Sequence, residues 1–178
     1  MATAKIILLA INILGGIAVI GSYITGLSSS QNGANALWGG TPLNVRPLYT
    51  VSMIISALGY FFFLYFILFR LDPSGISTAG NLGFNVFHIV FIGMLLFSAL
   101  WMPLTNLFVA NPSAFLWIGI RIVLAIVGLS SLALTLILAS LHPGQTGLAY
   151  WLAVFGSAYF TFHTLVLDAI LWPIFFRM

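Results

Sequence analysis

The sequence predicts an all-α integral membrane protein, a single bundle of five transmembrane helices over residues 1–178. Hydrophobic residues make up 62% of the chain and charged residues 4%, whereas about a quarter of the residues in a soluble domain are charged. Five stretches reach the roughly 20 apolar residues that an α-helix needs to cross a bilayer. The alternation of polar and apolar residues that a membrane β-barrel requires is absent.

The five spans are expected at residues 5–27, 48–69, 82–102, 114–141 and 147–176. The first exceeds the apolar region of a signal peptide, about 7–15 residues, so we expect it to be retained. The last two are long enough to tilt. The loop at 28–47 is long and rich in Ser, Asn and Gly, and it carries Trp38. Long loops in compact bundles are usually lids or linkers, and we expect this one to fold back over the bundle, with Trp38 reaching it.

An odd number of spans places the two termini on opposite sides of the membrane. We call the side of Lys5 side one and the opposite side side two. Side one then carries Lys5 and Arg70, and side two carries Arg46 and Arg177. This tie leaves the orientation open under the positive-inside rule. The expected location is multi-pass, in a bacterial inner membrane or an organelle membrane, with the lipid bilayer as the first partner.

Composition excludes several classes of function. The chain has no Cys, which removes disulfides and thiolate chemistry. A net charge of +3 over the whole chain does not favour nucleic acid as a partner. No two His residues have helical spacing and there is no Glu, so no metal site is expected. His163 and Asp168 lie about 140° apart on an α-helix, so they form no evident dyad. Without a nucleophile elbow, a P-loop or a carboxylate pair, no catalytic residue is assigned and an enzyme is the less favoured interpretation.

Arg121 and Asp168 are the only charges inside predicted spans. A charge at the bilayer centre costs at least about 2.5–3.5 kcal/mol, so such residues are usually paired or functional. At a rise of about 1.5 Å per residue, both lie roughly 12–13 Å from side two. The sequence therefore predicts a buried ion pair between Arg121 and Asp168 that joins spans four and five. This pair either has the structural role of fixing the helix register alone, or it also contacts a ligand.

Two spans carry polar side chains at helical spacing, and each set falls on one face. Such faces either hold helices together or line a cavity. We expect a ligand cavity in the side-two half, where four of the five tryptophans also map. Its walls are predicted to be Trp38, Tyr49, Ser52, Ser56, Tyr60, Trp101, Ser157, Thr161, Thr164 and Asp168.

Three segments carry a resemblance to a known family. Residues 47–60 are similar to the span-two entry of the tryptophan-rich sensory protein/translocator protein (TspO/MBR) family, with Tyr49 in the position of a Trp. Residues 100–108 resemble its Leu-x-Trp-Ser-Pro-Leu-Phe-Phe motif, and residues 149–168 resemble its fifth helix, with Asp168 at or one residue beyond an Asn. The first-loop motif is reduced, and the Pro-Tyr of the fifth helix and the sterol motif at its end are missing. The resemblance implies five helices, a first loop over a cavity, and a porphyrin or sterol as ligand.

Three functions remain open. The first is binding or transport of a small apolar ligand, such as a tetrapyrrole, a sterol or another lipid, in a cavity between helices. The second is a structural or assembly subunit of a larger membrane complex, without a ligand of its own. The third is an integral membrane enzyme that acts on a lipid. A homodimer or a larger membrane complex is left open as the state of assembly, and no cofactor is certain.

Overall fold

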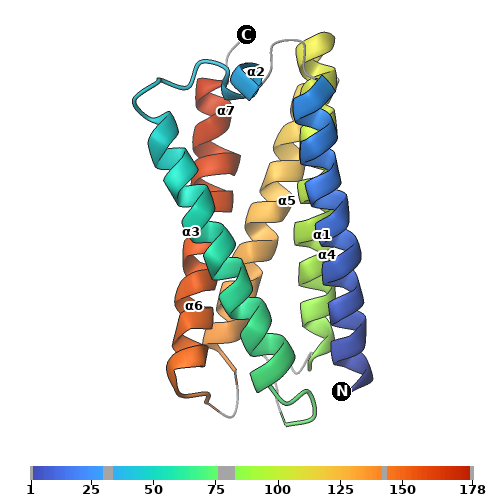
Figure 1. Ribbon diagram of the computed structural model, residues 1–178, viewed down its shortest axis with the longest axis vertical. Coiled ribbons are helices and arrows are strands. Elements are labelled where there is room, and N and C mark those ends of the chain that lie inside the picture. The colour runs from blue at the N-terminus through green and yellow to red at the C-terminus, as the bar shows by residue number, and fades with distance from the viewer. Residues whose placement is uncertain (1, 30–33, 76–82, 142–143, 177–178) are drawn as a thin grey trace.

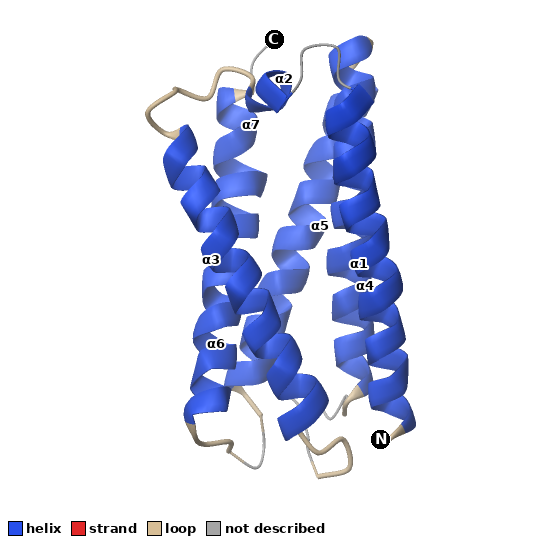
Figure 2. Ribbon diagram, in the orientation of Figure 1, coloured by secondary structure: helices blue, strands red, loops and turns tan. Residues whose placement is uncertain are grey.

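The computed structural model describes residues 2–29, 34–75, 83–141 and 144–176. These residues are helical or in loops and turns, with no strand among them (Figure 2). Five continuous helical stretches are long and apolar enough to cross a membrane, which confirms the predicted fold class. The elements are α1 (Thr3–Ser29), α2 (Ala34–Trp38), α3 (Arg46–Tyr65), η1 (Phe66–Arg70), α4 (Asn85–Ala110), α5 (Ala114–Ala139), α6 (Leu148–Thr161), η2 (Phe162–Leu171) and α7 (Trp172–Phe175).

The helices cross the bundle in alternating directions, so that the two chain ends lie at opposite ends of the molecule (Figure 1). Helix α1 packs on α4, and α3 packs on α6, while α5 contacts α4 on one side and α6 with η2 on the other. The bundle therefore consists of two helix pairs that are joined through α5.

Two features differ from the predicted boundaries. Helix α4 runs through Pro103 to Ala110 instead of ending at residue 102. A proline is tolerated within a transmembrane helix because neighbouring helices and local adjustments compensate for the missing backbone hydrogen bond. The first loop contains a short helix, α2, that the Gly- and Asn-rich sequence did not indicate.

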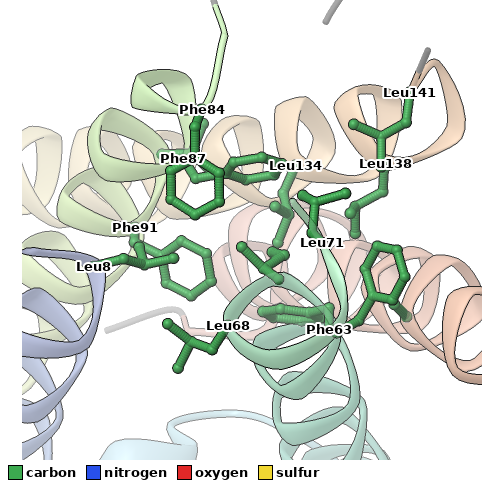
Figure 3. Close-up of a cluster of buried hydrophobic side chains, with 14 of the residues drawn as sticks. Leu8, Phe63, Leu68, Leu71, Phe84, Phe87, Phe91, Leu134, Leu138 and Leu141 are labelled. Atoms are coloured by element: carbon green, nitrogen blue, oxygen red, sulfur yellow. The ribbon is translucent and has the colours of Figure 1, made fainter. Parts of the chain in front are cut away.

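The side-one half holds the larger apolar core (Figure 3). Phe63, Phe87, Phe91 and Leu134 have no exposed surface there, and they come from α3, α4 and α5. The side-two half holds a smaller, mainly aromatic cluster, in which the stacked rings of Trp172 and Phe176 lie 4.4 Å apart. Three of the five buried residues in this cluster are aromatic, and Ile120 and Leu124 are the other two.

Helices α3 and α6 meet backbone to backbone at Gly59 and Gly156. A Cβ atom added to Gly59 would lie 2.6 Å from the carbonyl oxygen of Gly156, and one added to Gly156 would lie 2.9 Å from Cα of Gly59. Small residues at such crossings allow membrane helices to approach closely, which adds van der Waals contact where no hydrophobic effect operates. This contact sets the position of α3 along the axis of the spanning helix that carries Asp168.

Candidate functional site

The fifth spanning helix changes its winding in the region that carries Asp168. Segment η2 is a π-helix, in which hydrogen bonds run from residue i to residue i+5. The wider turn brings residues five apart onto one face, whereas an α-helix would separate them by about 140°. Nε2 of His163 lies 3.6 Å from Oδ2 of Asp168 as a result. The expectation that these two residues form no dyad is therefore wrong, and the reason is the π-helical winding.

The dyad extends to α3 through a serine. A hydrogen bond of 2.9 Å joins Oγ of Ser52 to Nδ1 of His163. The hydroxyl of Tyr159 donates to the same Oγ at 3.3 Å. Ser52 is buried, and the side chain of His163 is only 7% exposed. The result is a continuous polar chain, Tyr159–Ser52–His163–Asp168, between α3 and the fifth spanning helix.

Asp168 is the more exposed end of this series of polar side chains. Its side chain is 29% exposed, about four times the exposed fraction of the His163 side chain. Its carboxyl group lies within electrostatic range of the phenols of Tyr23 in α1 and Tyr49 in α3. The Tyr49 hydroxyl donates to the carbonyl oxygen of Leu167 at 3.0 Å, which holds α3 against η2 beside the carboxylate. Asp168 thus lies between elements of both helix pairs.

Aromatic rings from five segments surround this level of the bundle. The ring centroid of Trp101 lies 5.8 Å from that of Tyr23 and 5.7 Å from that of Trp172. On the α3 side, the rings of Trp38 and Tyr49 meet edge to face at 6.0 Å. Nε1 of Trp101 is buried and has no hydrogen-bond partner in the structure. We call these five residues the aromatic ring set: Tyr23, Trp38, Tyr49, Trp101 and Trp172.

The first loop covers this end of the bundle, as predicted for the part that the structure describes. Nε1 of Trp172 donates to the carbonyl oxygen of Leu37 in α2 at 3.0 Å. The backbone N–H of Gly40 donates to the carbonyl oxygen of Phe175 at 3.0 Å. Gly39 has a φ of +51° and lies against Phe176, so both its backbone conformation and the lack of a side chain are needed there. The loop is therefore fastened to α7.

The predicted polar face of the fifth span points elsewhere. A hydrogen bond of 2.7 Å joins Thr164 to Ser131, and one of 2.9 Å joins Thr161 to Thr135, both across to α5. Ser157 is fully buried and donates to the carbonyl oxygen of Val154 in its own helix. The two threonines hold the fifth span against α5, and Ser157 is bonded within its own helix, so these hydroxyls are not paired with the polar side chains of α3.

The polar face of α3 divides between two regions. Tyr49 and Ser52 lie at the Asp168 level, as described above. Ser56 is buried, and its Oγ has no hydrogen-bond partner among the described residues. The Tyr60 hydroxyl donates to Oδ1 of Asn12 in α1, nearer to the side-one core. Of the other nine residues predicted to line a ligand cavity with Asp168, Ser52 is connected to it through His163 and Tyr49 bonds to the adjacent Leu167. Trp38 contacts the ring of Tyr49, and Trp101 contacts those of Tyr23 and Trp172.

The ion pair predicted between Arg121 and Asp168 is not formed. In the part of the chain that the structure describes, the salt bridge of Asp168 is made with His163. Arg121 is exposed, as are its neighbours Ile118 and Ile122, while Ile120 is fully buried. The pair was predicted because both residues lie at a similar depth in the membrane. Depth does not show which way a side chain faces, and Arg121 lies on the outward face of α5.

Sequence reasoning missed Tyr23, Tyr159 and Trp172, which reach the site from α1, α6 and α7. The described residues contain no group of three or more His, Asp or Glu side chains with the proximity that a metal ion requires.

Comparisons with known proteins found no matching family, no matching curated protein and no matching solved structure.

Proposed function

We propose that this membrane protein binds a small, largely apolar ligand in the side-two half of the bundle, under α2 and beside Asp168. The observation that carries the proposal is the exposure of Asp168. A carboxylate within a spanning helix is costly unless it is paired or solvated, yet this one has 29% of its side chain exposed and only His163 as a salt-bridge partner among the described residues. A ligand with a hydrogen-bond donor supplies the missing partner.

The surroundings of Asp168 indicate the shape of that ligand. Within the aromatic ring set, Tyr23 is exposed and Trp38 and Trp101 are half-buried, so they offer flat apolar surfaces from α1, α2 and α4, while Tyr49 and Trp172 are buried behind them. Nε1 of Trp101, which has no hydrogen-bond partner in the described part of the chain, supplies a donor for a second polar group. A sterol, with its rigid body and single hydroxyl, matches this combination well. A tetrapyrrole fits if its N–H groups face Asp168 and its carboxylates point away from it, and the resemblance to the TspO/MBR family implies ligands of these two kinds.

Quenching of tryptophan fluorescence tests the proposal. We expect a fluorescent sterol analogue or protoporphyrin to quench the purified protein saturably in detergent. Hydrogen bonds to charged groups contribute about 1.5–3 kcal/mol, so Asp168→Asn should weaken sterol binding at least about tenfold. Trp101→Phe should remove a large part of the quenched signal. Trp151→Phe is the matched control, because Trp151 is exposed near the side-one end of α6.

The proposal is wrong if quenching does not saturate, or if Asp168→Asn and the wild type bind the probes equally. In that case the function as an assembly subunit is favoured instead, because the hydroxyl pairs between α5 and the fifth span already act as packing contacts. Mass spectrometry of small molecules that copurify with the protein in mild detergent separates these two outcomes independently of the chosen probe.

Hydrolysis of a lipid ester is a second candidate, favoured by one observation. Ser52, His163 and Asp168 are connected in the order nucleophile, base and carboxylate. In such a reaction, Oγ of Ser52 attacks the ester carbonyl and its proton passes to His163 and then to the leaving alcohol. Water then releases the acid and restores the serine. This candidate ranks second because Ser52 is buried on the side of α3 that contacts η2. A substrate would reach this serine only if the two segments separated.

A fluorophosphonate probe tests the hydrolase function. Covalent labelling that is lost in Ser52→Ala and retained in Ser56→Ala would support it, since both serines are buried on the same face of α3. Absence of labelling in the folded wild-type protein, with intact tryptophan fluorescence, would exclude Ser52 as a nucleophile.

A further inference from the structure

The side-one end of the bundle holds an open hollow of about 350 Å³, away from the aromatic ring set. It is lined by the first turn of α1 and by the end of η1 with the loop that follows, including Lys5, Arg70 and Asp72. Lys5 lies two residues inside the first spanning helix, and Arg70 is the last residue of the second. Both cations therefore lie at the side-one ends of candidate spans, which is the level at which we expect the lipid headgroups.

The backbone around this hollow is held in place. Nε2 of His88 in α4 lies 2.8 Å from the carbonyl oxygen of Ala4, which ties the start of α1 to α4. Leu71 is buried, and its N–H donates to the carbonyl oxygen of Phe66, which ends η1. The two segments that supply the cations are thus anchored independently to the core.

The charges in the hollow do not neutralise one another through direct contacts. Among the described residues, neither Lys5 nor Arg70 takes part in a salt bridge. Asp72 is held instead by Ser74, whose backbone N–H and hydroxyl donate to Oδ1 at 3.0 and 2.9 Å. These hydrogen bonds, with a smaller contribution from Lys5, lower the pKa of Asp72, so it stays ionised at neutral pH. Two cations and one carboxylate leave one net positive charge.

We propose that this hollow binds the phosphate group of an anionic phospholipid. A phosphodiester carries one negative charge and accepts hydrogen bonds from both a guanidinium and an ammonium group. Basic pockets between spanning helices bind anionic headgroups in this way. Ile6 and Phe69, next to the two cations, are 52% and 63% exposed, so they offer an apolar surface for the acyl chains. This surface favours a lipid over free phosphate.

Native mass spectrometry of the full chain in a neutral detergent tests the proposal. The probes are phosphatidylglycerol, phosphatidylcholine with the same acyl chains, and inorganic phosphate. We expect phosphatidylglycerol to bind preferentially. One basic residue near anionic lipid contributes about 1 kcal/mol, equivalent to roughly fivefold in affinity. Lys5→Gln and Arg70→Gln should each weaken binding about fivefold, and the double variant about 25-fold.

Two further variants separate charge from folding. Lys5→Arg combined with Arg70→Lys keeps both charges and should retain most of the affinity. Asp72→Asn removes the repelling carboxylate while its amide oxygen still accepts from Ser74, so it should tighten binding about fivefold. A variant that merely misfolds cannot bind more tightly. Equal binding of the two lipids, or unchanged affinity in the double Gln variant, would overturn the proposal. Inorganic phosphate that displaces the lipid as effectively as a second lipid molecule would overturn the assignment to a phospholipid.

Discussion

The substitution Gly59→Ala tests the backbone contact between α3 and α6. The new Cβ would lie 2.6 Å from the carbonyl oxygen of Gly156, which falls about 0.8 Å short of the 3.4 Å at which ordinary contact begins. The atom it meets belongs to the backbone, so no side-chain rotation relieves the overlap and the two helices must separate. Overpacking of this kind costs about 1–3 kcal/mol, while alanine gains up to about 1 kcal/mol over glycine in helix propensity.

After subtraction of this gain, we expect Gly59→Ala to lower the free energy of unfolding by up to about 2 kcal/mol. Gly119→Ala in α5 is the matched control, because a Cβ there meets nothing within 4 Å. The control should be neutral or stabilising by up to about 1 kcal/mol. The measurement is circular dichroism during titration of maltoside micelles with SDS. If Gly59→Ala is as stable as Gly119→Ala, α3 and α6 are not in backbone contact and the packing described above is incorrect.

Three further predictions concern other contacts. A double-mutant cycle with Ser131→Ala and Thr164→Val should give a coupling energy of about 0.6 kcal/mol, and at most about 1.7 kcal/mol, as measured for hydrogen bonds between membrane helices; strict additivity would show that the hydroxyls do not interact. Arg121→Gln should not lower the unfolding free energy, because the side chain faces outward, makes no salt bridge among the described residues, and is itself costly as a charge inside a span; a loss of several kcal/mol would point to a buried partner. Because Ser74 lowers the pKa of Asp72, the stabilisation that their contact provides is present above the unfolded-state pKa and is lost as the pH falls through the folded-state pKa. Ser74→Ala should raise the pKa of Asp72 in an NMR titration of the carboxyl carbon, and an unchanged midpoint would contradict this.

The fold could be predicted because the bilayer imposes a length on each helix. Long apolar runs with few charges leave little choice but spanning helices, and five such runs were visible. The end of the third spanning helix could not be predicted in this way, because a proline lies there. The third span was expected to end at residue 102, directly before Pro103, whereas α4 continues past this proline for seven residues to Ala110.

The direction in which each helix faces could not be predicted in the same way. In water, the apolar stripe of a helix shows which side is buried. In a bilayer, the lipid-facing residues are apolar too, so Ile118 and Ile120 look equivalent in sequence although one is exposed and the other fully buried. Arg121 was consequently placed at the correct end of α5 but on the wrong face. The pairing of His163 with Asp168 had no sequence signal, because nothing in the composition of residues 162–171 indicates π-helical winding.

Because η2 is π-helical, the contact between His163 and Asp168 depends on the number of residues in this segment. A turn closed by an i to i+5 hydrogen bond holds one residue more than an α-helical turn, which is what the insertion of a single codon would produce. A homologous chain one residue shorter in this segment could keep the same helix ends and the same apolar character, yet its histidine and aspartate would lie on different faces. In this protein, the deletion of one residue between His163 and Asp168 is therefore enough to separate the two side chains, although every residue that remains is unchanged.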